Sequence, residues 1–158
     1  MGLEVCFDPS SRFLAVGTAM SQVRVYDIDK KIQTHHFMGH RGVITRLAFL
    51  PGADSLKVIS SAEDFLVKVW DLVLGKDIVT LKGNLGRVTA FELTRDAKTM
   101  FVGARDGKIS LYNTQNQFKL ISTISCQELG LADEEVTCLK YVYLNENSSL
   151  LVIGGETG

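Results

Sequence analysis

The chain has 158 residues, of which 46% are hydrophobic, so it is long enough to bury a substantial core. Its 17 basic and 18 acidic side chains nearly cancel, which removes the general electrostatic argument for direct binding to nucleic acid or to an anionic membrane. No apolar run approaches the roughly 20 residues of a membrane helix, and no basic and then apolar leader opens the chain, so the sequence predicts a soluble protein that is not secreted.

Short runs of β-branched and apolar residues, bounded by turn residues, predict β-strands throughout the chain. No segment has a long apolar period of 3.6 residues, so the expected fold class is all-β. The strands fall into successive units. In chain order they are expected at residues 5–7, 13–17, 23–27, 32–37, then 44–50, 56–60, 67–71, 77–81, then 88–93, 99–103, 109–113, 118–124, and finally 136–142 and 150–154.

The third strand of the first three units ends in an aromatic residue followed by an acid or its amide. These dipeptides are Tyr26-Asp27, Trp70-Asp71 and Tyr112-Asn113, and their aromatic residues lie 44 and 42 residues apart. Recurrence at such a spacing is the signature of a repeat architecture. Between the second and third strands of the third unit, Asp106-Gly107 predicts a tight hairpin because both residues tolerate a positive φ.

Four antiparallel strands in about 43 residues, repeated along the chain, are typical of the blade of a β-propeller. The clearest unit runs from Gly39-His40 to Trp70-Asp71, and across its whole length the sequence resembles the WD-repeat (WD40) family. The resemblance implies a partial β-propeller of about three to four blades, part of a longer polypeptide with a ring of about seven. We expect the blades at residues 1–38, 39–82, 83–126 and, incomplete, 127–158.

His40, Ser60 and Asp64 are the residue types of a hydrolase triad, which relays a proton to an oxygen nucleophile. No Gly-x-Ser-x-Gly turn surrounds Ser60 to present it as a nucleophile. The family resemblance implies a structural role instead. In WD-repeat proteins, the residues that match these positions and Trp70 form a hydrogen-bonded chain that links the loop before the first strand to the second and third strands. We therefore expect a structural network and no catalytic residue.

Two other patterns fail as cofactor or metal sites. The segment 103–110 superficially resembles a phosphate-binding loop, but three residues separate its glycines where the motif needs four, and Ile109 follows the lysine in place of Ser or Thr. His35 and His36 are adjacent on an expected strand, so they point to opposite faces and cannot easily join His40 on one ion. We expect one of the pair between blades, the other exposed, and His40 in the network.

The remaining polar features predict surface or packing roles. On the third strands, Arg24, Lys68 and Ser110 alternate with apolar residues, so we expect them to be solvated or packed between blades. The run 133–135 is expected to be a solvated acidic loop, with a contact for a basic partner as the alternative. The three cysteines are widely spaced among apolar neighbours, which favours buried thiols in a reducing compartment.

A narrower resemblance lies in the stretches 34–39 and 42–51, together with Ser60-Ser61-Ala62 and 67–70. They are similar to the transducin-β-like family of UtpB subunits in the small-subunit processome, and His35-His36-Phe37 is the distinctive part. The resemblance implies a noncatalytic scaffold in the nucleus and nucleolus that acts in pre-rRNA processing. Its partners would be WD-repeat proteins of a large ribonucleoprotein assembly, with RNA contact that is indirect or made through surface loops.

Two other functions remain open at this stage. One is a cytoplasmic WD-repeat adaptor, of the G-protein-β-like kind or a ubiquitin-ligase substrate receptor. Copurification separates an adaptor from a processome subunit. The other is a propeller hydrolase, which requires that replacement of Ser60 abolish turnover while the fold survives. A structural Ser60 requires the opposite result, a loss of stability with no turnover to lose.

Overall fold

The computed structural model describes residues 4–52, 56–82, 86–130, 135–145 and 148–155, and these are almost entirely β-strand. The chain divides into two compact units, Met1–Gly83 and Asn84–Gly158. The described part contains one short 3₁₀ helix, η1 (Gln127–Leu129). It contains no helix that is long and apolar enough to cross a membrane.

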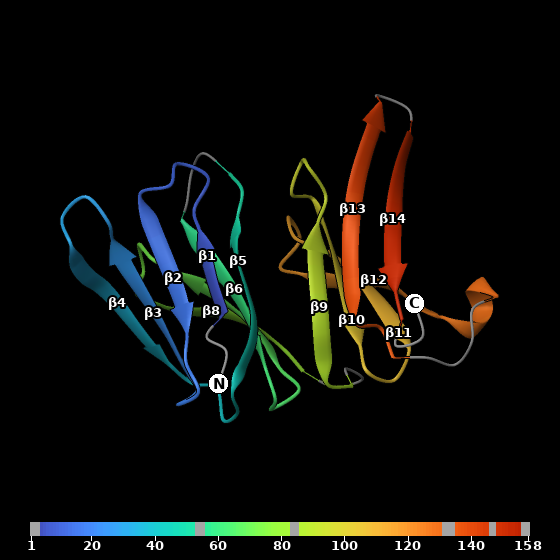
Figure 1. Cartoon of the computed structure of the whole chain (residues 1–158), viewed down its shortest axis with the longest axis horizontal. Helices are drawn as coiled ribbons and strands as arrows, with labels where there is room; N and C mark the ends of the chain where they lie inside the picture. The colour runs from blue at the N-terminus through green and yellow to red at the C-terminus, as the bar shows by residue number, and fades with distance from the viewer. Residues whose placement is uncertain (1–3, 53–55, 83–85, 131–134, 146–147, 156–158) are drawn as a thin grey trace. The chain divides into compact units, whose positions relative to one another are not determined.

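The first unit contains two four-stranded antiparallel sheets, in which strands pair in the order of the sequence (Figure 1). The short turns between successive strands make neighbours in sequence neighbours in space. The first sheet consists of β1 (Glu4–Phe7), β2 (Phe13–Gly17), β3 (Gln22–Asp27) and β4 (Ile32–Met38), and the second of β5 (Ile44–Leu50), β6 (Lys57–Ala62), β7 (Val67–Asp71) and β8 (Lys76–Leu81).

The second unit contains a third four-stranded sheet of the same order and a two-stranded sheet. Within this unit, β13 lies beside β9, the first strand of the neighbouring sheet (Figure 1). Its strands are β9 (Val88–Leu93), β10 (Thr99–Ala104), β11 (Lys108–Asn113) and β12 (Lys119–Ser125), followed by β13 (Cys138–Asn145) and β14 (Ser148–Gly154).

Within each unit, the two sheets meet through the same contact at the end of a second strand. At Gly17, an added Cβ would lie 2.5 Å from Ile44 Cγ2, on the first strand of the next sheet. At Gly103, an added Cβ would lie 2.6 Å from Cγ1 of Val136, just before β13. Real Cβ atoms do not approach so closely, so these positions need glycine for the sheets to touch.

The backbone repeats this contact. The N–H of Ile44 donates to the Thr18 carbonyl at 3.4 Å, and the N–H of Val136 donates to the Ala104 carbonyl at 3.3 Å. The acceptors each follow one of the two contact glycines directly in sequence. Both interfaces also bury the side chains concerned, since Ile44 and Val136 belong to the apolar cores of their units. The internal repeat in the sequence is therefore also a repeat of packing geometry.

The acid or amide after each aromatic residue holds the turn into the fourth strand. Asp71 Oδ1 accepts the backbone N–H groups of Val73 and Leu74, at 2.8 and 3.0 Å. Asp27 accepts from Lys30 N–H, and Asn113 caps the corresponding turn of the third sheet. Side chains of Asp and Asn favour such turns because they satisfy backbone donors two or three residues later. This local role accounts for the second residue of the repeated dipeptide.

The expected strands are found with small shifts. The clearest difference is the start of β13, which we expected at Val136 and which begins at Cys138. Val136 gives its N–H to the neighbouring sheet, so it does not enter the ladder of its own sheet. The predicted hairpin at Asp106-Gly107 exists, but only Gly107 has a positive φ, of 71°. Its N–H donates to the Ala104 carbonyl, which is typical of a type I turn followed by a left-handed glycine.

The cysteines differ in exposure, which corrects the expectation of three buried thiols. Cys126 is buried and Cys6 is half-buried against the first-unit core, whereas Cys138 is exposed. Cys138 lies next to the buried Leu139 on β13, so strand alternation turns its side chain outward. Burial raises the pKa of the Cys6 thiol to about 12, with the Glu4 carboxylate adding to the effect.

We expect Cys138 to react first with a soluble disulfide reagent at pH 8, and Cys6 to react far more slowly because its thiolate is scarce at that pH. Thiolate release can be followed by absorbance under native conditions. Substitution of Cys138→Ser should remove the fast phase. If that variant kept it, the assignment of the exposed thiol would be wrong.

Candidate functional site: a buried polar network in the second sheet

Four side chains from different parts of the second sheet form one chain of hydrogen bonds. His40 lies in the loop before β5, Ser60 on β6, Asp64 in the β6–β7 turn and Trp70 on β7. Nδ1 of His40 lies 2.9 Å from Asp64 Oδ2, and its Nε2 lies 2.8 Å from Ser60 Oγ. Trp70 Nε1 donates to the same Ser60 oxygen at 2.7 Å.

The partners fix where the protons lie. An ionised Asp64 can only accept, so Nδ1 of His40 carries a proton and donates it to the carboxylate. The indole N–H of Trp70 can only donate, so Ser60 Oγ accepts from it and gives its own proton to Nε2 of His40. Every polar group in the chain then has a partner, and His40 is the neutral tautomer protonated on Nδ1.

Asp64 also accepts hydrogen bonds from backbone N–H groups on both sides of the network. Its Oδ2 accepts the N–H of Arg41 at 2.8 Å, and its Oδ1 accepts the N–H of Leu66 at 3.1 Å. One carboxylate therefore joins the loop that enters the sheet to the turn between β6 and β7. Burial raises the pKa of Asp64, but the hydrogen bonds from Arg41 and His40 outweigh it and hold that pKa below its usual value.

Trp70 connects this network to the first sheet. Its side chain is 2% exposed and stacks on Phe37 of β4, with ring centroids 5.1 Å apart. Phe37 in turn stacks on His35 at 5.5 Å. His35 Nε2 donates to the Leu72 carbonyl at 2.7 Å, whereas His36 is exposed. One histidine of the pair thus bridges the two sheets of this unit, as its alternating position predicted.

Lys68 extends the network in a way that we did not predict. It is 8% exposed, and its Nζ donates to Asp77 Oδ2 at 2.8 Å and to Thr80 Oγ1 at 2.9 Å on β8. The ammonium also lies 5.3 Å from the Trp70 ring centroid. Lys68 is therefore packed and not solvated, which is the second of the two environments expected for it. In the strand register Lys68 lies opposite Thr80, and Asp77 lies opposite Trp70 two residues along. A lysine and an aspartate on two consecutive predicted strands, within reach of a diagonal contact, were the signal that could have identified this pair.

The equivalent third-strand positions in the other sheets are also less solvated than expected. Ser110 is 4% exposed and lies 3.2 Å from the Thr123 hydroxyl. Arg24 is half-buried, and one of its guanidinium nitrogens donates to Gln22 Oε1 at 2.9 Å. Its Nε is buried without a hydrogen-bond partner in the part of the chain that the structure describes. Packing against the sheets, rather than solvation, is the rule at this position.

The triad geometry cannot serve a nucleophile in this environment. Ser60 is 0% exposed, and its oxygen already accepts the indole N–H of Trp70. Attack on a carbonyl would require a substrate atom within about 3 to 3.5 Å of that oxygen, inside a packed sheet. Burial, the largest cause, lowers the pKa of His40, which keeps the imidazole neutral within the network.

The lowered pKa of His40 predicts a pH dependence of stability. Below its ordinary pKa of 6.5, the unfolded chain protonates this histidine while the folded chain resists protonation. Its contribution to stability is therefore complete above pH 6.5 and is lost as the pH falls through the folded pKa. Urea unfolding between pH 7.5 and 5 should show this loss, and the His40→Asn variant should show a smaller slope. The exposed-site variant His36→Asn is the control, and an unchanged slope in His40→Asn would contradict the prediction.

The positions of this network carry other residues in the neighbouring units. Met20, at the position of Asp64, is 74% exposed, and Gly83-Asn84, which stands where the second unit has Gly39-His40, lies outside the described residues. Sequence reasoning missed Asp106, which precedes Tyr112 by the same six residues that separate Asp64 from Trp70. The Asp106 carboxylate lies 3.2 Å from Lys108 Nζ. The spacing from the aromatic residue was the signal that could have found it.

The structure also shows where the segment that resembles a phosphate-binding loop, the possible metal ligands and the acidic run lie. The segment 103–110 forms the β10–β11 hairpin and continues as a strand, not as the helix that a phosphate-binding loop requires. Within the described ranges, no group of three or more His, Cys, Asp or Glu lies close enough to hold a metal ion. Of the acidic run, Asp133 and Glu134 lie outside those ranges, and Glu135 pairs with Arg105.

Comparison with known proteins identifies several sequence relatives. Transducin beta-like protein 3 of Bos taurus is 36% identical over 102 residues, which are 65% of this chain, and the mouse protein is 33% identical over 71% of it. The Denticleless protein homolog of Mus musculus is 31% identical over 72% of the chain. The matched regions span 13 to 16% of the length of these relatives.

A solved structure and a family model identify the fold and the family. The crystal structure of the computationally designed Ika4 protein superposes with a TM-score of 0.77 at 24% identity, covering 99% of this chain and 87% of that one. Together with the four-stranded sheets, this match confirms the predicted all-β fold of β-propeller blades. The family model described as WD domain, G-beta repeat matches residues 30–71 and 75–113. The chain therefore belongs to the WD-repeat family.

Proposed function

We propose that this chain is a noncatalytic protein-interaction scaffold and part of a subunit of the nucleolar small-subunit processome, acting in pre-rRNA processing and ribosome biogenesis. The observation that carries the proposal is the similarity to proteins named transducin beta-like protein 3, at 33 to 36% identity. The distinctive segment supports it, because His35 and Phe37 take part in the contact between the first two sheets. Its partners are then WD-repeat proteins of the same assembly.

The scaffold role follows from the buried position of the polar network residues. The polar groups that resemble a triad are buried and paired within the sheet, so they stabilise the fold. What remains for partners is the surface of the turns and outer strands, held by rigid sheets. The blade limits that we propose are residues 1–38, 39–82, 83–126 and 127–158, and the four network residues are proposed to fix the register of the second blade.

Affinity purification of the tagged chain from nuclear extract of its source organism tests the function. We expect the enriched proteins to include other propeller subunits of the processome, and a fluorescent fusion to concentrate in the nucleolus. Because we propose that protein contacts hold the chain in its assembly, with RNA contact either indirect or confined to surface loops, the association should survive treatment with ribonuclease. An unrelated WD-repeat chain carrying the same tag is the control.

A different outcome would replace the proposal. Enrichment of cytoplasmic signalling proteins or of ubiquitin-ligase subunits, with no processome protein above the control, would favour the adaptor function. Loss of all partners after ribonuclease treatment would mean that RNA, and not a protein, carries the association.

A further inference from the structure

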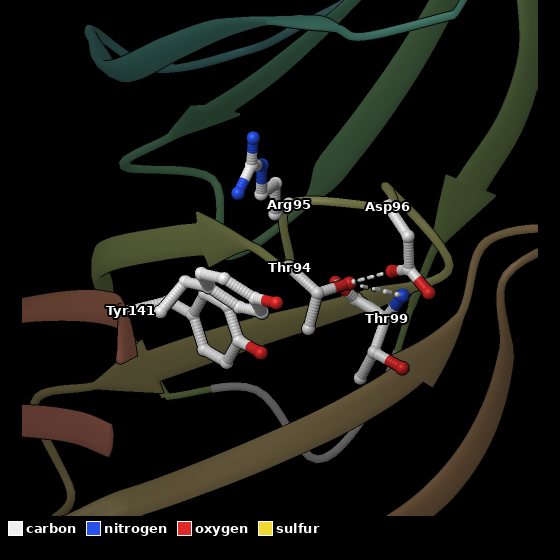
Figure 2. A pocket seen from close by; sticks show the side chains of 6 residues that line it. Thr94, Arg95, Asp96, Thr99 and Tyr141 are labelled. Carbon is white, nitrogen blue, oxygen red and sulfur yellow. Dashed lines mark hydrogen bonds between the residues drawn. The ribbon is translucent and has the colours of Figure 1, made fainter. Parts of the chain in front are cut away.

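A pocket lies within the second unit, between the β9–β10 turn and β13. Its volume is about 520 Å³, within the 300 to 1,000 Å³ of typical ligand sites. Thr94, Arg95 and Asp96 of the turn, Thr99 at the start of β10 and Tyr141 line it, and Figure 2 shows Thr94 next to the Tyr141 side chain. Tyr143 lines the same pocket, because residues two apart on a strand share a face.

The turn that forms one wall is held in place by its own hydrogen bonds (Figure 2). The Thr94 hydroxyl donates to Asp96 Oδ1 at 2.7 Å and accepts the N–H of Thr99 at 3.0 Å. Asp96 also accepts the N–H of Lys98, and its other oxygen lies 3.7 Å from Lys98 Nζ. Oδ1 of Asp96 is therefore engaged within the turn, and Oδ2 of Asp96 lies near the Lys98 ammonium.

The donors around the pocket are not engaged. The Arg95 guanidinium lies over the Tyr143 ring, 5.0 Å from its centroid, and makes no ion pair or hydrogen bond to another described residue. The hydroxyls of Tyr141 and Tyr143 likewise have no hydrogen-bond partner among the residues that the structure describes. Phe101 stacks on Tyr141 at 6.2 Å and supports that ring. One cation and two phenols thus offer donors to a ligand between aromatic walls.

We propose that this pocket binds an extended segment of a partner protein through an acidic side chain, with the carboxylate on Arg95 and the tyrosine hydroxyls. A guanidinium matches a carboxylate with two parallel hydrogen bonds, and the tyrosine rings pack against the aliphatic stem and its apolar neighbours. A phosphate group is a poorer match, because sites for this dianion gather several arginines and only Arg95 is cationic among the lining residues. The assignment rests on the proposed scaffold function and names a class of partner for it.

Two small peptides test the inference on the 158-residue chain. Acetyl-Leu-Glu-Leu-amide and acetyl-Leu-Gln-Leu-amide differ only in the charge of the central side chain. Each is titrated into the ¹⁵N-labelled protein, and backbone and arginine side-chain signals are followed by NMR. We expect the glutamate peptide to shift the signals of residues 94–99 and of the Arg95 side chain, and the glutamine peptide to bind at least about 10-fold more weakly.

Variants separate the pocket from general charge effects. Arg95→Gln should weaken the glutamate peptide about 10-fold or more and erase its advantage over the glutamine peptide, while Arg95→Lys keeps the charge and part of the affinity. Arg41→Gln removes the same charge from an exposed position of the first unit and should bind like the parent. If Arg95→Gln fails to fold, the comparison of the two peptides on the parent chain and on Arg95→Lys still decides.

Three results would overturn the inference. The first is that the glutamate peptide, at millimolar concentration and in about 10-fold excess over the protein, shifts no signal of residues 94–99. The second is that the two peptides bind with equal affinity, and the third is that inorganic phosphate binds at the same residues as tightly as the glutamate peptide. Failure here is distinguishable from failure of the proposed function. If the chain copurifies with processome proteins but does not bind the peptide, only the pocket assignment is rejected. If it binds the peptide but copurifies with other proteins, only the processome assignment is rejected.

Discussion

Replacing Trp70 with alanine is expected to lower the free energy of unfolding by about 3 to 5 kcal/mol, the largest loss from a single change in this chain. The indole is 2% exposed and stacks on Phe37 of the neighbouring sheet, so its removal leaves a cavity between the two sheets of the first unit. It also removes the donor to Ser60 Oγ. Urea unfolding followed by circular dichroism measures the loss.

Two further variants make the Trp70 result interpretable. Trp70→Phe keeps most of the ring and removes only the indole N–H, so it should cost less than Trp70→Ala and fold where the alanine variant does not. Tyr112→Ala removes the equivalent aromatic residue of the third sheet, which is 7% exposed, and should also cost less because that side chain is smaller. A loss below about 1 kcal/mol in Trp70→Ala would contradict the role of Trp70 in the core.

Replacing Ser60 with alanine should cost about 1 to 3 kcal/mol, because one deletion leaves two buried groups without a partner. Trp70 Nε1 loses its acceptor and Nε2 of His40 loses its donor, both in a site from which water is excluded. The fluorescence of the single tryptophan, which lies next to this position, reports the unfolding of the first unit directly.

The matched control for Ser60 is Ser110→Ala. Ser110 is also buried, but its hydroxyl lies 3.2 Å from that of Thr123, farther than His40 Nε2 and Trp70 Nε1 lie from Ser60 Oγ, so its removal should cost less. Ester hydrolysis measured on the parent chain and on Ser60→Ala separates the structural from the enzymatic interpretation. We expect no difference between them. A turnover that disappears in Ser60→Ala while the stability stays unchanged would overturn the structural role.

The strands and their order were predictable because the signals for each strand lie close together in the sequence. Alternating aliphatic residues, turn residues and the repeated aromatic–acid dipeptide act within a few positions of each other, and these patterns located nearly every strand. The start of β13 was misplaced for a different reason. Val136 resembles a strand residue in its sequence neighbourhood, but its N–H is taken by a carbonyl of the adjacent sheet.

The site was predictable only where its members recur at fixed offsets. His40, Ser60, Asp64 and Trp70 were identified through a family pattern, whereas for Lys68 the sequence left a solvated and a packed side chain open, because alternation alone does not show which face a neighbouring sheet covers. The pocket at Arg95 was not visible in the sequence. It brings a turn together with Tyr141 and Tyr143, more than 40 residues away, and only the packing of two sheets creates that proximity.

The glycine contacts at Gly17 and Gly103 carry a consequence for how such chains are ordered. Both joints use the same elements, a bare backbone at the end of one second strand and a branched aliphatic residue at the start of the next sheet. A glycine–aliphatic contact of this kind does not discriminate between one neighbouring sheet and another. Which blade follows which is therefore specified by covalent connectivity and by distinctive side chains such as His35, and not by the fit of the joint itself.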